Sequence, residues 1–229
     1  MSRTVPFARP DIGDEEIRAV TEVLESGWIT TGGKTKEFED RFALRVGAGH
    51  AVAVNSCTAA LHLALEAVGI GAGDDVIVPT MTFAATGEVV SYLGARPVLV
   101  DVLEGDHNID PDAVRRAVTP RTRAIVPVHF AGQACRLDAL LEIARSLPDC
   151  AVVEDAAHAL PAAFKGKTIG SIGDITCFSF YATKTMTTGE GGMATTQNEE
   201  WAERMRLMSL HGISKDAWNR YTAAGTWYY

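Results

Sequence analysis

The sequence predicts an α/β fold: a three-layer α/β/α sandwich around a mostly parallel sheet of seven strands. Short runs rich in Val and Ile alternate with segments of helical periodicity along the whole chain. The runs are almost continuously apolar, which is typical of parallel strands buried on both faces. A length of 229 residues, of which 47% are hydrophobic, is enough for one large core. No repeat or low-complexity linker divides it.

The elements follow one another in an alternating order. Five buried strands are predicted at 51–56, 75–81, 97–102, 123–130 and 151–156. Helices are predicted at 13–26, 34–46, 58–69, 84–93, 112–118, 137–146 and 198–210. Two further strands, 174–180 and 191–196, are close in sequence, so we expect one of them to run antiparallel to the rest.

Composition excludes several classes of function. The formal net charge of −8, without any run of Lys or Arg, argues against a general nucleic-acid binder. The four cysteines, Cys57, Cys135, Cys150 and Cys177, form no CxxC pair and no metal-ligand spacing, so we expect reduced thiols and no metal site. No apolar run approaches about 18 residues and the first residues contain no apolar leader core. The sequence therefore predicts a cytoplasmic protein that does not bind membranes.

The segment from 152 to 193 carries the chemistry. Asp155 ends the apolar run AVVED, so it is expected at the carboxyl end of a buried strand, where open α/β sheets build their ligand sites. Ser179 ends another apolar run, and Lys184 follows among small polar residues, TKTMTTGEGG. Pyridoxal phosphate (PLP) needs such groups: an acid for the pyridine nitrogen, a hydroxyl for the phosphate and an amine that bonds to the aldehyde. Nearby glycines, Gly189 to Gly192 with Glu190 among them, are expected to let the backbone turn beside the lysine.

Each supporting residue also has a structural interpretation. His158 can be a core histidine or lie beside the cofactor ring, and Phe83 can be core or stack on the pyridine face. Cys57 and Thr58 begin a helix directly after a strand, where they form either an ordinary cap or an anion site.

The loop that contains Trp28 and Thr30, SGWITTGGKTKEFE, joins the first two predicted helices. Loops of this kind line substrate pockets in many enzymes, but an ordinary helix–helix connection has the same composition. The sequence leaves both interpretations open.

Nine segments, taken together and in order, resemble the DegT/DnrJ-type sugar aminotransferases among the fold-type I, aspartate aminotransferase-like PLP enzymes. They are FARPDIGDEEIRAV, SGWITTGGKTKEFE, NSCTAALHLAL, GDDVIVPTMTFAAT, GARPVLVDV, TRAIVPVHFAGQ, EDAAHALPA, GSIGDITCFSFYATKTMTTGEGGM and LHGI. The resemblance covers essentially the whole chain, and the order of the segments makes it specific.

The resemblance implies a role for each candidate residue. Lys184 is similar to the lysine that bonds to PLP and carries protons, and Asp155 to the partner of the pyridine nitrogen. Ser179, the amides of Cys57 and Thr58, and the Thr58 hydroxyl are similar to the phosphate ligands. Phe83 stands at the position of the stacking aromatic and His158 beside the ring; Trp28 and Thr30 are expected near the substrate. Many members of the family have Gly in place of Cys57, which contributes only its amide.

The family also implies a reaction and an assembly. We expect transfer of an amino group from L-glutamate to a nucleotide-linked keto sugar, in particular a 4-keto-6-deoxy hexose, by a homodimer. Two alternatives stay open: a keto-cyclitol substrate, and an inactive truncated fragment that binds cofactor weakly. Family members continue into a smaller C-terminal domain. Residues 1–212 are therefore expected to form the PLP-binding large domain, with its N-terminal helices, and 213–229 to begin the connection to that missing domain.

Overall fold

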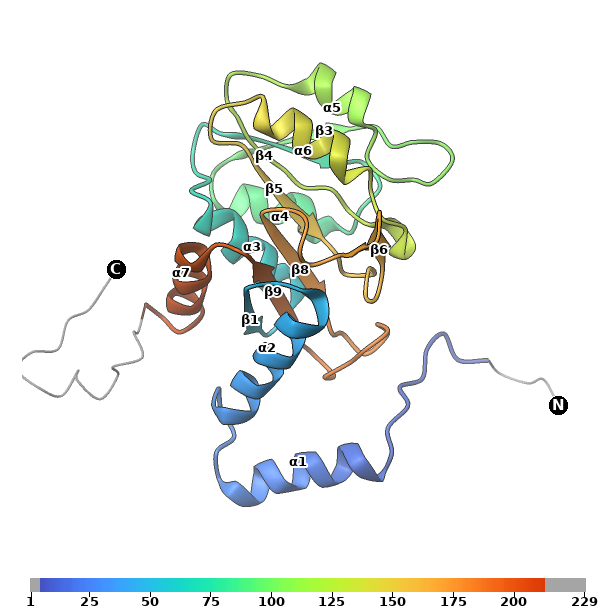
Figure 1. Ribbon diagram of the computed structural model, residues 1–229, viewed down its shortest axis with the longest axis vertical. Helices are drawn as coiled ribbons and strands as arrows, with labels where there is room; N and C mark the ends of the chain where they lie inside the picture. Colours follow the sequence, from blue (N-terminus) through green and yellow to red (C-terminus); the bar gives the residue numbers. More distant parts are fainter. Residues whose placement is uncertain (1–4, 213–229) are drawn as a thin grey trace, which may run out of the picture.

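A computed structural model describes residues 5–212, and its centre is the predicted seven-stranded sheet (Figure 1). The strand order is β1-β9-β8-β5-β4-β2-β3. The strands are β1 (His50–Val54), β2 (Asp75–Pro79), β3 (Arg96–Val100), β4 (Thr122–Ile125), β5 (Ala151–Asp155), β8 (Ile175–Ser179) and β9 (Gly192–Thr196). The predicted fold class, a mostly parallel sheet within an α/β fold, is confirmed.

One strand runs against the others. β3, β2, β4, β5 and β8 pair in parallel, whereas β9 is antiparallel to both of its neighbours, β8 and β1. The expected antiparallel strand is therefore β9, and β1 has the same direction as β8. It follows that β1, β2, β5 and β8 end, and β9 begins, on one side of the sheet, which we call its carboxyl end.

Helices cover both faces of the sheet and give the predicted three layers. The covering helices are α2 (Gly33–Val46), α3 (Cys57–Ala67), α4 (Ala84–Tyr92), α5 (Pro111–Ala117), α6 (Leu137–Arg145) and α7 (Glu199–Ser209), whereas α1 (Asp14–Ser26) belongs to neither layer. One core cluster combines α2, α5 and α6 with one face of the sheet, and the other combines α3, α4 and α7 with the opposite face. The helix ends differ from the prediction by one or two residues, which is ordinary for frayed termini.

Two local features differ from the prediction. β4 ends at Ile125, so the predicted strand 123–130 was too long, because Pro127 has no N–H to donate to a neighbouring strand. A short hairpin of β6 (Ala163–Phe164) and β7 (Lys167–Thr168) was not predicted. Its two-residue turn, Lys165 and Gly166, has positive φ at both positions, as this tight hairpin turn requires.

The two N-terminal helices are positioned differently. α2 contributes Phe42 and Val46 to the core, but no residue of α1 is buried. Ile17, Val20 and Leu24, spaced to share one face of α1, are each more than half exposed. In Figure 1 this helix lies apart from the sandwich. No helix in the described part of the chain is long and apolar enough to cross a membrane. The predicted connection, 213–229, lies outside the described residues.

Candidate functional site

The carboxyl end of the sheet gathers predicted cofactor residues from four strands. β1 leads into α3 at Cys57 and Thr58, and β2 leads into the loop that ends at Phe83. β5 ends at Asp155, three residues before His158, and β8 ends at Ser179, five residues before Lys184. Since these strands share one direction, residues up to about 130 positions apart in the sequence meet at the same side of the sheet.

Asp155 is a buried carboxylate with neutral partners only. Its side chain is 4% exposed. One oxygen, Oδ2, accepts a hydrogen bond from the Thr86 hydroxyl at 2.8 Å, and the other, Oδ1, accepts one from the Ala157 amide at 3.1 Å. The Cys57 thiol lies 3.9 Å from Oδ1. No Lys or Arg of the described residues pairs with this carboxylate. Its negative charge is therefore buried without a cation.

The N-terminus of α3 offers backbone amides at the carboxyl end of the sheet. Ser56 is the N-cap, and its hydroxyl accepts a hydrogen bond from the Ala59 amide at 3.1 Å. The amides of Cys57 and Thr58, in the first turn, have no carbonyl partner within the helix and are suited to bind an anion. A cap and an anion site are therefore compatible at this helix end.

Gly192, the first residue of β9, packs against the backbone at the N-terminus of α3, where a side chain would not fit. A Cβ at this position would lie 2.3 Å from the Ser56 carbonyl carbon and 2.6 Å from the Cys57 nitrogen. Of the glycines that were expected to form the turn, Gly189 alone has a positive φ, of 81°. Gly192 has a different purpose: it lets the start of β9 lie directly against the start of α3.

The amine and the hydroxyl lie at the end of β8. Ser179 is half-buried, and its Oγ accepts a hydrogen bond from the Tyr181 amide at 3.3 Å. A tight turn follows, in which the Lys184 amide donates to the Tyr181 carbonyl at 2.9 Å. The Lys184 side chain is half-buried, and no ion pair within residues 5–212 engages its ammonium group.

His158 and Phe83 are both exposed at this end of the sheet. Atoms around the His158 ring shield it from part of the solvent, and this desolvation lowers the pKa of the imidazole. The positive charge of Lys184 lowers this pKa further, whereas the charge of Asp155 acts in the opposite direction. The shift favours the neutral form of the imidazole. Phe83 is the N-cap of α4, and its ring is 79% exposed. An exposed aromatic ring beside buried polar groups is typical of a ligand contact.

Trp28 and Thr30 lie on the exposed loop between α1 and α2. The Trp28 indole N–H donates to the Thr31 carbonyl at 3.2 Å, and the indole packs over Gly32. No hydrogen bond of the described residues joins this loop to the residues at the carboxyl end of the sheet. The structure brings together Cys57, Thr58, Phe83, Asp155, His158, Ser179 and Lys184, and leaves Trp28 and Thr30 outside this group.

Three contacts at the site could not be read from the sequence. Thr86, fully buried in the first turn of α4, donates to Asp155, and Thr82 lies 2.6 Å from the Thr86 hydroxyl. The Cys57 side chain points at Asp155, and burial followed by the charge of Asp155 raises its pKa well above the ordinary value. The only indication of these contacts in the sequence is the i, i+4 spacing of two threonines after a strand, and many surface helices have the same spacing.

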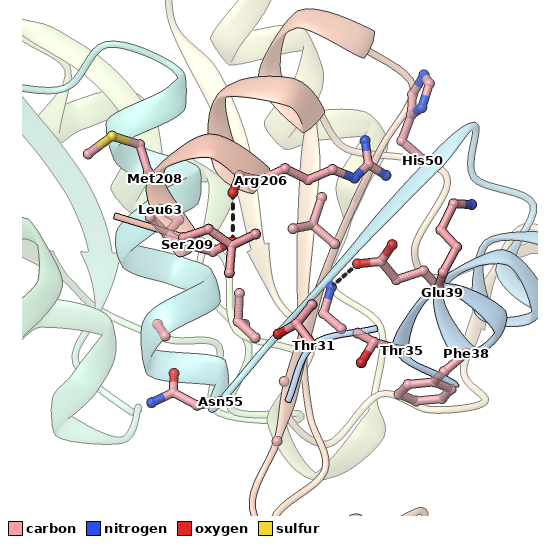
Figure 2. Close-up of a pocket in the computed structure, with 18 of the residues that line it drawn as sticks. Thr31, Thr35, Phe38, Glu39, His50, Asn55, Leu63, Arg206, Met208 and Ser209 are labelled. Atoms are coloured by element: carbon pink, nitrogen blue, oxygen red, sulfur yellow. Dashed lines mark hydrogen bonds between the residues drawn. The ribbon is translucent and has the colours of Figure 1, made fainter. Parts of the chain in front are cut away.

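An open groove lies elsewhere, along the free edge of β1 between α2 and α7 (Figure 2). There Glu39 Oε1 accepts a hydrogen bond from the Ala53 amide at 2.9 Å, and Arg206 donates to the Ala51 carbonyl at 2.9 Å. These side chains satisfy backbone groups that an edge strand leaves free. Asp155, His158, Ser179 and Lys184 do not line this groove. The candidate site is therefore the carboxyl end of the sheet.

Comparison with known proteins gives consistent matches. The model of the DegT/DnrJ/EryC1/StrS aminotransferase family matches residues 10–226. The spore coat polysaccharide biosynthesis protein SpsC of Bacillus subtilis is 57% identical over 98% of the chain. The uncharacterized protein MJ1066 of Methanocaldococcus jannaschii is 54% identical over the same share. The chain spans 58% of the length of each of these two relatives.

Solved structures agree with this match. The putative sugar aminotransferase Spr1654 from Streptococcus pneumoniae, in its PMP form, superposes with a TM-score of 0.90 at 41% identity, over 94% of this chain and 59% of that one. The same protein has also been solved in a PLP form. DesI, solved in the presence of its TDP-sugar product, superposes with a TM-score of 0.81 at 40% identity, over 88% of this chain and 51% of that one.

Proposed function

The chain belongs to the DegT/DnrJ/EryC1/StrS aminotransferase family, as its sequence motifs predict, and from this membership we propose that it forms the PLP-binding part of an aminotransferase. The observation that carries the proposal is Asp155, a buried carboxylate with no cationic partner among the described residues. Burying a charge without a counter-charge is costly. A ligand that brings a positive charge to this end of the sheet would remove that cost.

The residues present fit PLP. A carboxylate has about four acceptor positions, and Thr86, Ala157 and the weak thiol donor Cys57 engage at most three of those on Asp155. One position remains for the N–H of a protonated pyridine ring. The α3 amides of Cys57 and Thr58, with the Ser179 hydroxyl, are suited to a phosphate.

When bound, PLP supplies an electron-withdrawing ring that takes up the electron pair of the donor's Cα–H bond. In this proposal the Lys184 amine would hold the cofactor through its aldehyde; once the donor's amino group had taken its place, the released Lys184 amine would be the group that moves the proton. Phe83 would cover one face of the ring, and His158, whose pKa is lowered by desolvation and by Lys184, would lie next to it. Asp155 keeps the ring nitrogen protonated, which is an electrostatic contribution made before the reaction begins.

For the substrates we propose L-glutamate as the amino donor and a nucleotide-linked keto sugar, in particular a 4-keto-6-deoxy hexose, as the acceptor. The support is the likeness to Spr1654 and to DesI, whose structure was determined in the presence of a TDP-sugar product. Trp28 and Thr30, on the exposed α1–α2 loop, are proposed to contact the sugar.

One solved relative favours a second candidate substrate. The 3-amino-5-hydroxybenzoic acid synthase superposes with a TM-score of 0.86 at 41% identity, and the acid in its name is a carbocycle without a nucleotide. A keto-cyclitol is therefore the alternative acceptor. A substrate panel separates the two. The PLP-loaded protein is first treated with L-glutamate and is then offered either TDP- and UDP-linked keto sugars or keto-inositols. The acceptor that restores the PLP absorbance fastest is the substrate class.

The first experiment is a visible absorption spectrum of the 229-residue chain with PLP, before and after borohydride and after L-glutamate. The wild type should form a cofactor band that borohydride fixes covalently, and glutamate should remove the band. Lys184→Ala should lose the covalent fixation, whereas Lys167→Ala, at an exposed lysine on the β6–β7 hairpin, should keep it. Absence of any band in the wild type would mean that this chain is an inactive fragment, and would overturn the proposal for it.

We also propose that residues 1–212 are the large domain of a longer protein that forms a homodimer. The chain spans 58% of its two curated relatives, and α1 presents an unburied apolar face. Light scattering on the longer protein tests this: a mass of one copy would contradict it.

A further inference from the structure

The first turn of α4 contributes a side-chain hydrogen bond to the Asp155 carboxylate. Thr86, in this turn, is fully buried and donates its hydroxyl proton to Asp155 Oδ2 at 2.8 Å. Thr82, just before the helix, is half-buried, and its Oγ1 lies 2.6 Å from Thr86 Oγ1. Two hydroxyls and the carboxylate therefore form one continuous chain of hydrogen bonds.

The direction of this chain is fixed by counting protons. A threonine hydroxyl carries one proton, and an ionised carboxylate carries none. Because Thr86 gives its proton to Asp155, the proton between the two threonines must come from Thr82. The order is therefore Thr82 to Thr86 to Asp155, with each hydroxyl polarising the next.

Thr86 is also the strongest side-chain partner of Asp155. The other side chain, Cys57, is a weak thiol donor at 3.9 Å, and the Ala157 amide belongs to the chain's own turn after β5. A hydrogen bond to an ionised group is worth about twice as much as one between neutral groups. Thr86 therefore holds Oδ2 of the carboxylate, while Cys57 and the Ala157 amide contact Oδ1.

We propose that Thr86, oriented by Thr82, is a positioning residue that aims the Asp155 carboxylate at the ring nitrogen of the cofactor. The inference rests on the proposed function, because it needs a cofactor ring at Asp155. It adds a role for two residues that, within the described hydrogen bonds, have no bond to Cys57, Thr58, Ser179 or Lys184.

The protein offers a matched control variant on the other face of the sheet. Thr176, also fully buried, donates to the carboxylate of Glu154 at 2.7 Å. Glu154 also accepts from the Gly173 amide and contacts His129, and neither oxygen is at the candidate site. Thr176→Val removes the same type of bond from a buried carboxylate without touching Asp155.

The decisive test compares two ligands in binding titrations. One is PLP and the other is its 1-deaza analogue, in which a C–H group replaces the ring nitrogen. Thr86→Val should weaken PLP about tenfold but the analogue less than twofold, because only PLP uses Asp155. Thr86→Ser should restore PLP binding, and Thr82→Val should have a smaller effect of the same kind. Thr176→Val should change both ligands by the same factor.

Equal weakening of both ligands by Thr86→Val, or of neither, would overturn the inference. A second measurement decides it without cofactor. Thr86→Val should raise the unfolding equilibrium constant about tenfold in the wild-type background and less than threefold in Asp155→Leu. If the two backgrounds respond alike, Thr86 does not act through Asp155. A wild type that binds neither ligand overturns the proposed function instead, and the unfolding comparison still decides the hydrogen-bond chain.

Discussion

Two buried aspartates at opposite ends of the sheet have opposite surroundings. Asp75, the first residue of β2, is 1% exposed, and Arg96 binds both of its oxygens at 2.8 Å. Thr119 donates to it as well, and Arg121 lies 3.4 Å away. Asp155, the last residue of β5, is 4% exposed and has no cation among the described residues. The first carboxylate is compensated by cations of the fold, whereas the second has no counter-charge among the described residues.

The comparison teaches how to distinguish a structural charge from a functional one. Both residues satisfy the same sequence description, an acid at the end of a Val/Ile-rich strand. Partners decide the difference: two arginines at the amino end of the sheet, and only neutral donors at the carboxyl end. A buried carboxylate with its hydrogen bonds made but its charge uncompensated is the stronger candidate for a site.

The largest expected effect comes from removing the charge at the carboxyl end. Asp155→Asn should slow the reaction of the PLP-loaded chain with L-glutamate by about 10²- to 10³-fold, because the ring nitrogen loses its anionic partner. Stopped-flow absorbance measures this rate. Asp75→Asn is the matched control and should leave the rate within about twofold. Equal loss in both variants would contradict the distinction.

The reverse experiment measures stability. Asp75→Asn should lower the free energy of unfolding by about 2 kcal/mol, because two arginines and Thr119 lose an ionised acceptor. Asp155→Asn should cost less, since no cation of the described residues loses its partner. Urea unfolding of both variants at pH 7 checks the order, and a larger loss for Asp155→Asn would reverse our interpretation.

The dependence of stability on pH tests the ion pair of Asp75. The Arg96 hydrogen bond, with smaller contributions from Thr119 and Arg121, holds the pKa of Asp75 at about 2 although burial acts in the opposite direction. Its unfolded pKa is about 3.9. A folded pKa below the unfolded value contributes stability above pH 4, which is lost as pH falls towards 2. Wild type should therefore lose more stability than Asp75→Asn between pH 5 and pH 2.5; parallel curves would argue against the ion pair.

The smallest effect is expected at Cys57. Its thiol lies 3.9 Å from Asp155 and is a weak donor, while its amide, in the first turn of α3, does not depend on the side chain. Cys57→Ala should therefore change the dissociation constant of PLP by less than about threefold. Fluorescence titration tests this, and a tenfold change would mean that the thiol, and not Thr86, controls the carboxylate.

Several parts of the fold could be predicted because they depend on local sequence. The Val/Ile runs and helical periodicity predicted all seven strands of the sheet and the α-helices of residues 5–212, and the short link between 174–180 and 191–196 predicted one antiparallel strand. The errors were also local. Pro127 ends β4 early, and the Lys165–Gly166 turn forms a hairpin too short for any periodic pattern to reveal.

The site was only partly predictable. Asp155, Ser179 and Lys184 each end or follow an apolar run, so the sequence alone placed them at strand ends. Thr86 could not be found in this way. Its link to Asp155 joins residues 69 positions apart, and nothing in the pattern PTMTFAAT distinguishes a buried hydroxyl from an exposed one.

The sequence by itself determined the elements of this protein, its family and the residue types of its candidate site, because hydrophobic period and motif order are properties of neighbouring residues. Only the tertiary structure decided which buried acid is compensated. That depends on which side chains meet across the sheet: Arg96 and Arg121 reach Asp75, and Thr86 reaches Asp155. Charge pairing acts through space over a few ångströms, and sequence separation carries no information about that distance.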